Sequence, residues 1–529
     1  MTTQELPRWL VSFPLRHTVI AELIAGAMVL ALARLAWWMA LIAVMPVFVS
    51  AGLRYRGATA VGWLGRAARR RPRPTTIPEA FSVELPGVGP VGMRFDGQYA
   101  ITVIALHGRA FPTTTLVPEG ADTFDTVPLD VIGALLRQFG GLQLHSIDAV
   151  SAGSRVAPDG RYTPRYDEII GDRPAVGERR TWLVLRLCPQ ACLKALAYRG
   201  DVGVAVAAAT ERIRQAAVRA GCRAVTCSAD QLSAATHALL GGHEVGRFEE
   251  HWTHLRAGND YVTSYRMAGT DLTSRLLGDL WTIRSTMTVT LLRLTREPEG
   301  GIGVAALVRL HTPAPLTHPP LSTLHPLAGQ QFSALWASVP LGNRSLAISL
   351  SPRPLQPASR RLVDRRGLLV PVGPAGVMLG MSLDGVPLLM PFVDPLEFVK
   401  VAINAELDVV QSLLLRATAA GAVALVHTDR PELWEPICDE RMMLAGATEP
   451  MAAPTLVVAD GETALKRLLA TAGERGHALV AVTGTPPAEC DIAITQVSEG
   501  EIVVDVGQRR ISLAIMRPRN ETQFLSRLR

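Results

Sequence analysis

The sequence predicts a body of the α+β/α/β class, anchored by an N-terminal transmembrane hairpin of two helices. Residues 18–53 are apolar almost throughout, and a cluster of arginines follows them directly. The rest of the 529-residue chain alternates strand patterns with helix patterns, separated by glycines and prolines. Such alternation is typical of domains in which helices cover a sheet. We therefore expect a membrane module followed by a sheet-containing body.

The apolar run of residues 18–53 is too long for one crossing of a bilayer. Its 36 residues include only two charged ones, Glu22 and Arg34. As one helix they would extend about 54 Å, whereas the hydrocarbon core of a bilayer measures about 30 Å. Two helices fit better, with Arg34, Trp37 and Trp38 at the turn between them. Arginine and tryptophan both favour the membrane interface, because each combines an apolar body with a polar end.

Basic residues on both sides of the apolar run set its expected orientation. Arg8, Arg16 and His17 precede it. The basic connector that follows, residues 54–74, carries further arginines that we assign to the membrane interface: Arg54, Arg56, Arg66, Arg69, Arg70 and Arg71. Positively charged residues beside membrane helices stay on the cytoplasmic side. We therefore expect residues 1–17 and the bulk of the chain in the cytosol, attached to the cytoplasmic membrane.

Other interpretations of the apolar run differ in topology. A single tilted span followed by an interfacial helix would place the body outside the cell. A signal peptide has an apolar core of about 7 to 15 residues, which this run exceeds. A buried hairpin of a globular domain would show a polar face, and none interrupts either half. The connector is expected to continue the second helix by a turn or two, until the prolines of RPRP end it.

The charge and the cysteines fit an anchored cytosolic protein. Seven arginines between positions 54 and 73 account for the net charge of +6, so the remainder is close to neutral. This distribution gives no reason to expect nucleic-acid binding and fits attraction to anionic lipid headgroups. The six cysteines lack zinc-finger spacing and are expected to be reduced and buried.

The body is expected in three parts, residues 75–345, 346–421 and 422–529. The first begins with turn-rich strands and a helix within residues 127–141, and residues 179–242 then alternate strand, helix, strand and helix as in an α/β layer. Residues 321–340 are expected to form a helix broken at Pro326, and residues 394–421 one or two helices that begin at Asp394. Residues 301–312 are expected to pair with the strand before them. In the last part the α/β alternation resumes, with a helix from Pro431, and three strands end it as a meander.

Motifs for catalysis are scarce. The chain has no P-loop, no H-E-x-x-H and no G-x-S-x-G. Gly87, Gly89 and Gly92 form one G-x-G-x-x-G, but the pattern after them is that of a strand rather than the helix that a dinucleotide site requires. We therefore favour a hairpin loop over a cofactor site, and we assign no catalytic or cofactor-binding residue.

One stretch has the composition of a metal site. It contains four histidines and three glutamates: His237, His243, Glu244, Glu249, Glu250, His251 and His254. Their spacing fits no zinc pattern, so solvated histidines are favoured and no metal ligand is assigned. Asp148, Asp384 and Asp429 each follow or end a strand, where acidic residues commonly form turns.

Several stretches of the chain resemble EccE, a membrane component of the actinobacterial type VII (ESX) secretion system. They are the apolar hairpin with RYRGATAVGWLGRAARRRP, residues 180–215, DLTSRLLGDLWTIRSTMTVTLLRL with GIGVAALVRLHT, and GVMLGMSLDGVPLLMPFVDP. The resemblance implies a non-enzymatic, accessory scaffold subunit that works with EccB, EccC and EccD, of which EccC carries the ATPase motors. It also implies that the segment after Gly421 is an extension. The alternative is a membrane-tethered, transferase-like enzyme with a divergent active site.

Overall fold

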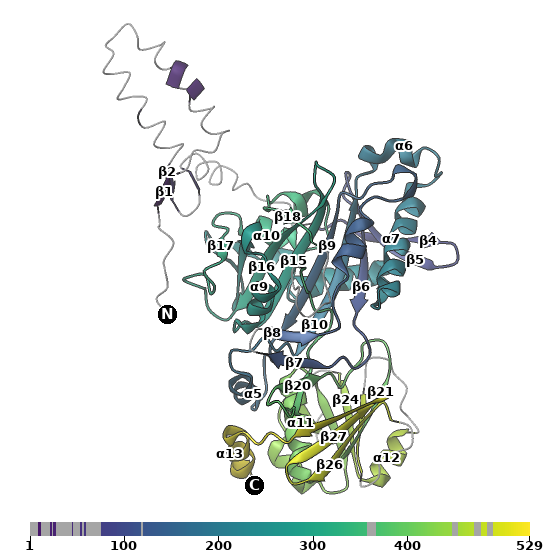
Figure 1. Cartoon of the computed structure of the whole chain (residues 1–529), viewed down its shortest axis with the longest axis vertical. Helices are drawn as coiled ribbons and strands as arrows, with labels where there is room; N and C mark the ends of the chain where they lie inside the picture. Colours follow the sequence, from purple (N-terminus) through teal and green to yellow (C-terminus); the bar gives the residue numbers. More distant parts are fainter. Residues whose placement is uncertain are drawn as a thin grey trace.

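Most of the body is described by the structure, a computed structural model. The described residues are 9–11, 22–23, 25–27, 45, 53–55, 58–59, 76–117, 120–356, 367–446, 453–469, 478–483 and 490–528. Within these ranges the chain forms two large sheets, each covered by helices, and a small sheet near the N-terminus (Figure 1). The prediction of a mixed, sheet-rich body with helices is therefore confirmed.

A small antiparallel sheet brackets the apolar run. It consists of β1 (Trp9–Val11), β2 (Leu53–Tyr55) and β3 (Ala58–Thr59), with β2 in the middle. The expectation that the second helix continues into the connector is wrong, because the backbone of β2 pairs with β1 on one side and β3 on the other. Most of residues 18–53 lie outside the described residues. Residues 22–23, 25–27 and 45 are described and helical, and Leu53 begins β2.

The first large sheet contains thirteen strands among the described residues, in the order β12-β13-β14-β16-β15-β9-β10-β6-β5-β4 with β11, β17 and β18 as side branches. The strands are β4 (Ala80–Leu85), β5 (Gly89–Phe95), β6 (Ala100–His107), β9 (Ser146–Ser154), β10 (Glu178–Leu187), β11 (Arg223–Thr226), β12 (Glu249–Glu250), β13 (Leu255–Ala257), β14 (Asp260–Met267), β15 (Met287–Arg296), β16 (Ile302–Thr312), β17 (Leu324–Pro326) and β18 (Arg353–Pro354). Its helices are α4 (Leu129–Ala134), α6 (Leu193–Leu196), α7 (Val202–Arg219), α8 (Ala229–Leu239), α9 (Ser274–Asp279) and α10 (Gln331–Ala337).

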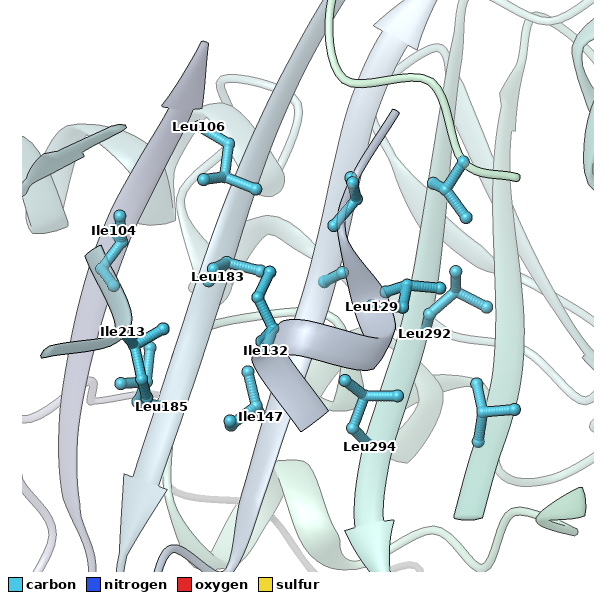
Figure 2. Packing of buried hydrophobic residues seen from close by; sticks show 14 of the residues in the cluster. Ile104, Leu106, Leu129, Ile132, Ile147, Leu183, Leu185, Ile213, Leu292 and Leu294 are labelled. Atoms are coloured by element: carbon cyan, nitrogen blue, oxygen red, sulfur yellow. The ribbon is translucent and has the colours of Figure 1, made fainter. Parts of the chain in front are cut away.

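Alternate residues of a strand point to opposite faces of the first sheet, and both faces pack against helices. In β6, Ile104 and Leu106 face the cluster that includes α4, α7 and α9, while Ile101 and Val103 face the cluster that includes α8 and α10. Figure 2 shows the first of these clusters, with Ile132 of α4 lying against the strands. Both faces of the first sheet are therefore covered by helices, which explains why the sequences of these strands are nearly continuous apolar runs.

The second large sheet contains twelve strands among the described residues, in the order β23-β22-β24-β25-β21-β26-β27-β28-β19-β20-β7-β8. They are β7 (Thr114–Val117), β8 (Gly120–Thr123), β19 (Val377–Met381), β20 (Pro387–Met390), β21 (Val399–Asn404), β22 (Ala424–Thr428), β23 (Met442–Leu444), β24 (Leu456–Asp460), β25 (Ala478–Val482), β26 (Ile492–Ser498), β27 (Glu501–Val506) and β28 (Arg509–Ala514). Its helices are α5 (Thr163–Ile170), α11 (Leu407–Ala419), α12 (Glu462–Leu469) and α13 (Arg519–Leu528).

The second sheet is parallel from β23 to β26 and antiparallel from there to β8. Residues of α5, α11 and α13 belong to the core on one face, and α12 packs on the other. The predicted α/β alternation near the C-terminus and the final meander are both confirmed. Strands β7 and β8 and helix α5 come from the first third of the chain, so the two sheets are linked by more than one crossing of the chain.

Short 3₁₀ helices connect several of these elements. They are η1 (Phe139–Gly141), η2 (Pro189–Cys192), η3 (Val245–Arg247), η4 (Gly269–Asp271), η5 (Leu280–Thr282), η6 (Asn343–Leu346), η7 (Pro431–Leu433) and η8 (Glu435–Ile437). The helix expected from Pro431 is thus two short 3₁₀ turns.

Three further expectations need correction. Strands β10 and β11 flank the antiparallel strand β6, so the strand–helix alternation of residues 179–242 builds an antiparallel sheet rather than a parallel layer. Residues 399–404 form the central strand β21, and Asp394 accepts hydrogen bonds from the backbone of Leu396 and Glu397 in a turn before it. Residues 324–326 form the edge strand β17, where Pro326 is tolerated.

Candidate functional site

Eight of the nine predicted membrane-interface residues lie outside the described residues: Arg34, Trp37, Trp38, Arg56, Arg66, Arg69, Arg70 and Arg71. The ninth, Arg54, lies in β2 with its backbone between Leu10 of β1 and Thr59 of β3. Among the residues that the structure describes, no helix has both the length and the apolar character needed to cross a bilayer. The membrane assignment of these arginines and tryptophans therefore stays a prediction.

Thr76, the first described residue after the connector, is tied to one end of the first sheet, and we call it the entry point to the body. The guanidinium Nη1 of Arg344 donates a hydrogen bond of 2.8 Å to the carbonyl oxygen of Thr76. The backbone N–H of the preceding residue, Asn343, donates to Asp96 Oδ2 at 2.6 Å. Asp96 also accepts a hydrogen bond of 2.8 Å from the backbone of Tyr99, directly before β6. The entry point is therefore fixed where β6 begins.

A buried ion triad lies across three neighbouring strands near this end. It consists of Asp148 of β9, Arg186 of β10 and Arg293 of β15, and all three side chains are buried. Arg293 Nη2 lies 2.8 Å from Asp148 Oδ2, and Arg186 Nη1 donates to the same oxygen. Burial opposes ionisation of Asp148, but the two guanidinium groups outweigh it and lower the pKa of this carboxyl group. Burial also lowers the pKa of Arg186.

The remaining donors of the triad hold the loop that carries Arg344. Arg186 donates through Nε to the carbonyl oxygen of Leu341, and Arg293 donates to those of Ser345 at 3.1 Å and Ala337 at 3.3 Å. Residues 337–345 are thus fastened to the centre of the sheet, and Arg344 in turn holds Thr76. Hydrogen bonds therefore link Thr76 to the buried centre of the first sheet.

The expectation that Asp148 forms a turn is wrong, because it lies inside β9 and is fully buried. Asp384 does lie in the turn between β19 and β20, and Asp429 lies in the bend after β22. The roles of Arg186 and Arg293 were not predicted. The available signal was a single arginine within an otherwise apolar strand, in RTWLVLRLCP and TMTVTLLRLTRE. A charge in such a position is buried only when it is paired.

A cavity of about 440 Å³ lies between the two large sheets. On one side it is lined by the end of β6 and the start of β10, and on the other by the end of α11 and residues 391–395. Arg223 crosses between the two sides, with Nη2 at 2.6 Å from Asp394 Oδ2 and Nε donating to the carbonyl oxygen of Gly108 at 2.7 Å. Burial first, and then the charge of Arg223, lower the pKa of His107 beside it.

Arg179 and Asp125 are further charged residues that line this cavity. The Arg179 guanidinium lies 4.4 Å from the ring centre of Trp281 and donates to the carbonyl oxygen of Pro371 at 3.3 Å. Burial lowers the pKa of Arg179 to about 9 and raises that of Asp125. Thr181 Oγ1 also donates to the carbonyl oxygen of Val372 at 2.7 Å. These polar groups mostly bind backbone or one another across the junction of the two sheets.

The histidine-rich stretch does not assemble as one cluster. His251 and His254 stack on each other, with ring centres 4.8 Å apart. His243 Nε2 lies 3.2 Å from Asp260 Oδ2, and His311 Nδ1 lies 2.6 Å from the same oxygen. Within the described ranges, no three His, Cys, Asp or Glu side chains are grouped so that they could hold a metal ion. Asp260 and the buried His311 were not predicted.

The remaining motifs are structural. Gly87 and Gly89 lie in and beside the turn of the β4–β5 hairpin, both with positive φ, so the G-x-G-x-x-G is a hairpin loop as predicted. At Gly92 a Cβ atom would lie 2.4 Å from the backbone of Ser228, which forms a capping box with Gln231 at the start of α8. All six cysteines are free, but only three are buried as expected, namely Cys192, Cys222 and Cys227; the other three are half-buried, namely Cys188, Cys438 and Cys490. Burial raises the pKa of Cys227 to about 12.

The described residues define a sheet-rich α+β protein whose first sheet is joined, at one end, to a basic N-terminal connector. The EccE family model, described as "Putative type VII ESX secretion system translocon, EccE", matches residues 175–267. ESX-1 secretion system protein EccE1 of Mycolicibacterium smegmatis is 30% identical over 405 residues, covering 73% of this chain and 74% of the relative. ESX-2 secretion system protein EccE2 of Mycobacterium tuberculosis is 29% identical over 424 residues, covering 79% and 75%.

A third relative, ESX-5 secretion system protein EccE5 of Mycobacterium marinum, is 29% identical over 363 residues, which cover 64% of this chain and 87% of the relative. The chain belongs to the EccE family. The resemblance inferred from the sequence is thereby confirmed.

Proposed function

We propose that this chain is a structural subunit of a type VII (ESX) secretion complex in the cytoplasmic membrane. Residues 18–53 anchor it as a two-helix hairpin, and the body from Thr76 onward lies in the cytosol. The subunit stabilises the assembly and positions its cytosolic parts beside EccB, EccC and EccD. Membership of the EccE family is the observation that carries this proposal, because its relatives are named as ESX secretion system proteins.

The geometry of the chain supports the hairpin topology. Val11 is paired with Leu53, so the chain leaves and returns at one place. A segment that spans a bilayer and returns to its starting side must cross an even number of times. The attachment of Thr76 to the loop held by the buried triad gives such an anchor a firm connection to the body.

The polar residues around the cavity between the sheets support a non-enzymatic role. Arg223, Arg179 and Thr181 bind carboxylate or backbone groups across the junction. We therefore assign this region to holding the two sheets together.

The proposal is tested by a green fluorescent protein fused to the C-terminus, which fluoresces only when it folds in the cytosol. Fluorescent membranes, and co-purification of an FtsK-like ATPase in mild detergent, are expected. The matched control fuses the same protein directly after Trp38, in the predicted turn between the two helices, where it should lie outside the cytosol and stay dark. Dark membranes from the complete chain would overturn the topology, and a fluorescent protein that purifies alone would overturn the role in the complex.

A further inference from the structure

Three large apolar side chains are exposed together at one end of the first sheet. They are Phe139 of η1, Leu193 of α6 and Tyr198, with exposed fractions of 81%, 66% and 94%. The two segments are in contact, because Arg199 Nη2 donates to the carbonyl oxygen of Phe139. Single exposed apolar residues are ordinary, but a group of them indicates a contact surface. We call Phe139, Leu193 and Tyr198, with the basic residues beside them, the α6 patch.

The basic residues of the α6 patch are Lys194, Arg199 and Arg212. Arg212 Nη1 donates to Gln138 Oε1 at 2.9 Å, so Arg199 and Arg212 both bind the segment around Phe139. Burial and then the positive charge of Arg199 lower the pKa of Arg212. Among the described residues, none of these three cations forms an ion pair with a carboxylate. The patch therefore combines exposed apolar area with positive charge that has not been neutralised.

The patch lies at the end of the first sheet where the chain enters the body. Strand β10 leads into η2 and α6, and its last residue, Leu187, is paired with Ala100 at the start of β6. The start of β6 is also where Asp96 holds the loop that binds Thr76. Figure 1 shows α6 at the end of the first sheet that is farthest from the second sheet. An anchor that precedes Thr76 would bring this end toward the bilayer.

We propose that the α6 patch rests on the anionic surface of the cytoplasmic leaflet. The aromatic and leucine side chains enter the headgroup region, and Lys194, Arg199 and Arg212 face lipid phosphates. This inference rests on the proposed membrane anchor, and it adds a second contact that sets the tilt of the body. The chemistry favours lipid over an acidic protein, because the same end also receives the basic connector.

The test uses the complete chain in nanodiscs of anionic phosphatidylglycerol or zwitterionic phosphatidylcholine. Hydrogen exchange of residues 193–200 is measured by mass spectrometry. We expect exchange about fivefold slower in the anionic nanodiscs, and this protection should disappear in L193D/Y198D. The control is L383D, which places one aspartate at a leucine that is 92% exposed in the β19–β20 turn, and each of L193D and Y198D is compared with it singly.

The possible outcomes distinguish the lipid contact of the α6 patch from the membrane anchor. Equal exchange in both nanodiscs, or protection that survives L193D/Y198D, overturns the lipid contact while the anchor stands. Protection that appears only when other ESX subunits are present also overturns it, because the occupant is then a protein. A chain that does not enter nanodiscs at all overturns the proposed anchor itself. Unchanged thermal unfolding of L193D/Y198D in detergent confirms that the variant is folded, because both side chains are exposed.

Discussion

Val11 and Leu53 are paired across the antiparallel strands β1 and β2, although 41 residues separate them. The chain therefore enters and leaves residues 12–52 at the same place. If this segment spans the membrane, its two flanks lie on the same side. Which side of the membrane the two flanks occupy is then decided by their positive charge, and most of that charge lies in the basic connector.

Neutralising the connector should disturb the orientation. We expect R66Q/R69Q/R70Q/R71Q to yield a mixed population, with part of the C-terminal fluorescent reporter lost to the outside, because positive residues beside the second helix fix the cytosolic side. The control R219Q/R247Q/R509Q/R510Q removes the same charge from exposed positions of the body and should keep full fluorescence. Equal fluorescence in both variants would contradict the assigned role of the connector.

The buried triad should be essential for stability. Asp148→Asn leaves two guanidinium groups buried without their carboxylate, which is expected to cost about 3 to 5 kcal/mol of unfolding free energy. The thermal unfolding midpoint of the purified protein measures the loss. Asp384→Asn, at the exposed turn before β20, should change the unfolding free energy by less than about 0.5 kcal/mol. A D148N protein that unfolds at the wild-type temperature would contradict the role of the triad.

Local patterns predicted the elements of the fold better than its strand order. The β15–β16 pairing follows from two apolar runs joined by a short turn, and the structure confirms it. The insertion of β6 between β10 and β11 could not be read from the sequence, because it depends on pairings between distant segments. The strand at residues 399–404 differs from the predicted helix for another reason, because a buried apolar run of this length fits either element.

The polar architecture was harder to predict. Arg293 reaches an aspartate 145 positions away, and neither residue carries a local motif. In the histidine-rich stretch, by contrast, residues that are close along the chain suggested a cluster, but the fold separates their side chains. His243 instead shares Asp260 with His311, which comes from the far end of β16. Only the tertiary fold decides which charges meet.

The burial of His311 should make stability depend on pH, and its contact with Asp260 only partly offsets that burial. Burial lowers the pKa of His311 in the folded protein, so below the unfolded value of about 6.5 the unfolded chain binds the proton more readily. Stability that is present above about pH 6.5 is therefore lost as the pH falls. The pKa of Asp260 is also lowered, since hydrogen bonds and charge from both histidines outweigh its burial. Its contribution is lost only under more acidic conditions, as the pH falls through its folded pKa.

Thermal unfolding between pH 7.5 and 5.0 measures this effect. We expect the wild-type midpoint to fall more steeply on acidification than that of His311→Asn, which keeps a polar group but cannot take up a proton. His237→Asn, at an exposed position of α8, should retain the wild-type slope. His107 and His145 also have lowered pKa values, each first because of burial, and they leave a residual slope in every variant. Identical slopes for wild type and H311N would contradict the assignment.

The junction between the two large sheets depends on a close approach at Gly177. A Cβ atom there would lie 2.3 Å from the carbonyl oxygen of Ala420, at the end of α11. Gly177→Ala must therefore push the helix away from the start of β10, and overpacking of this kind costs about 1 to 3 kcal/mol. The measurement is limited proteolysis in detergent together with the unfolding midpoint, and we expect faster cleavage around residues 420–423. The control Gly246→Ala adds the same methyl group where no atom lies within 4 Å. A G177A protein that resists protease as well as G246A does would show that the sheets do not rely on this contact.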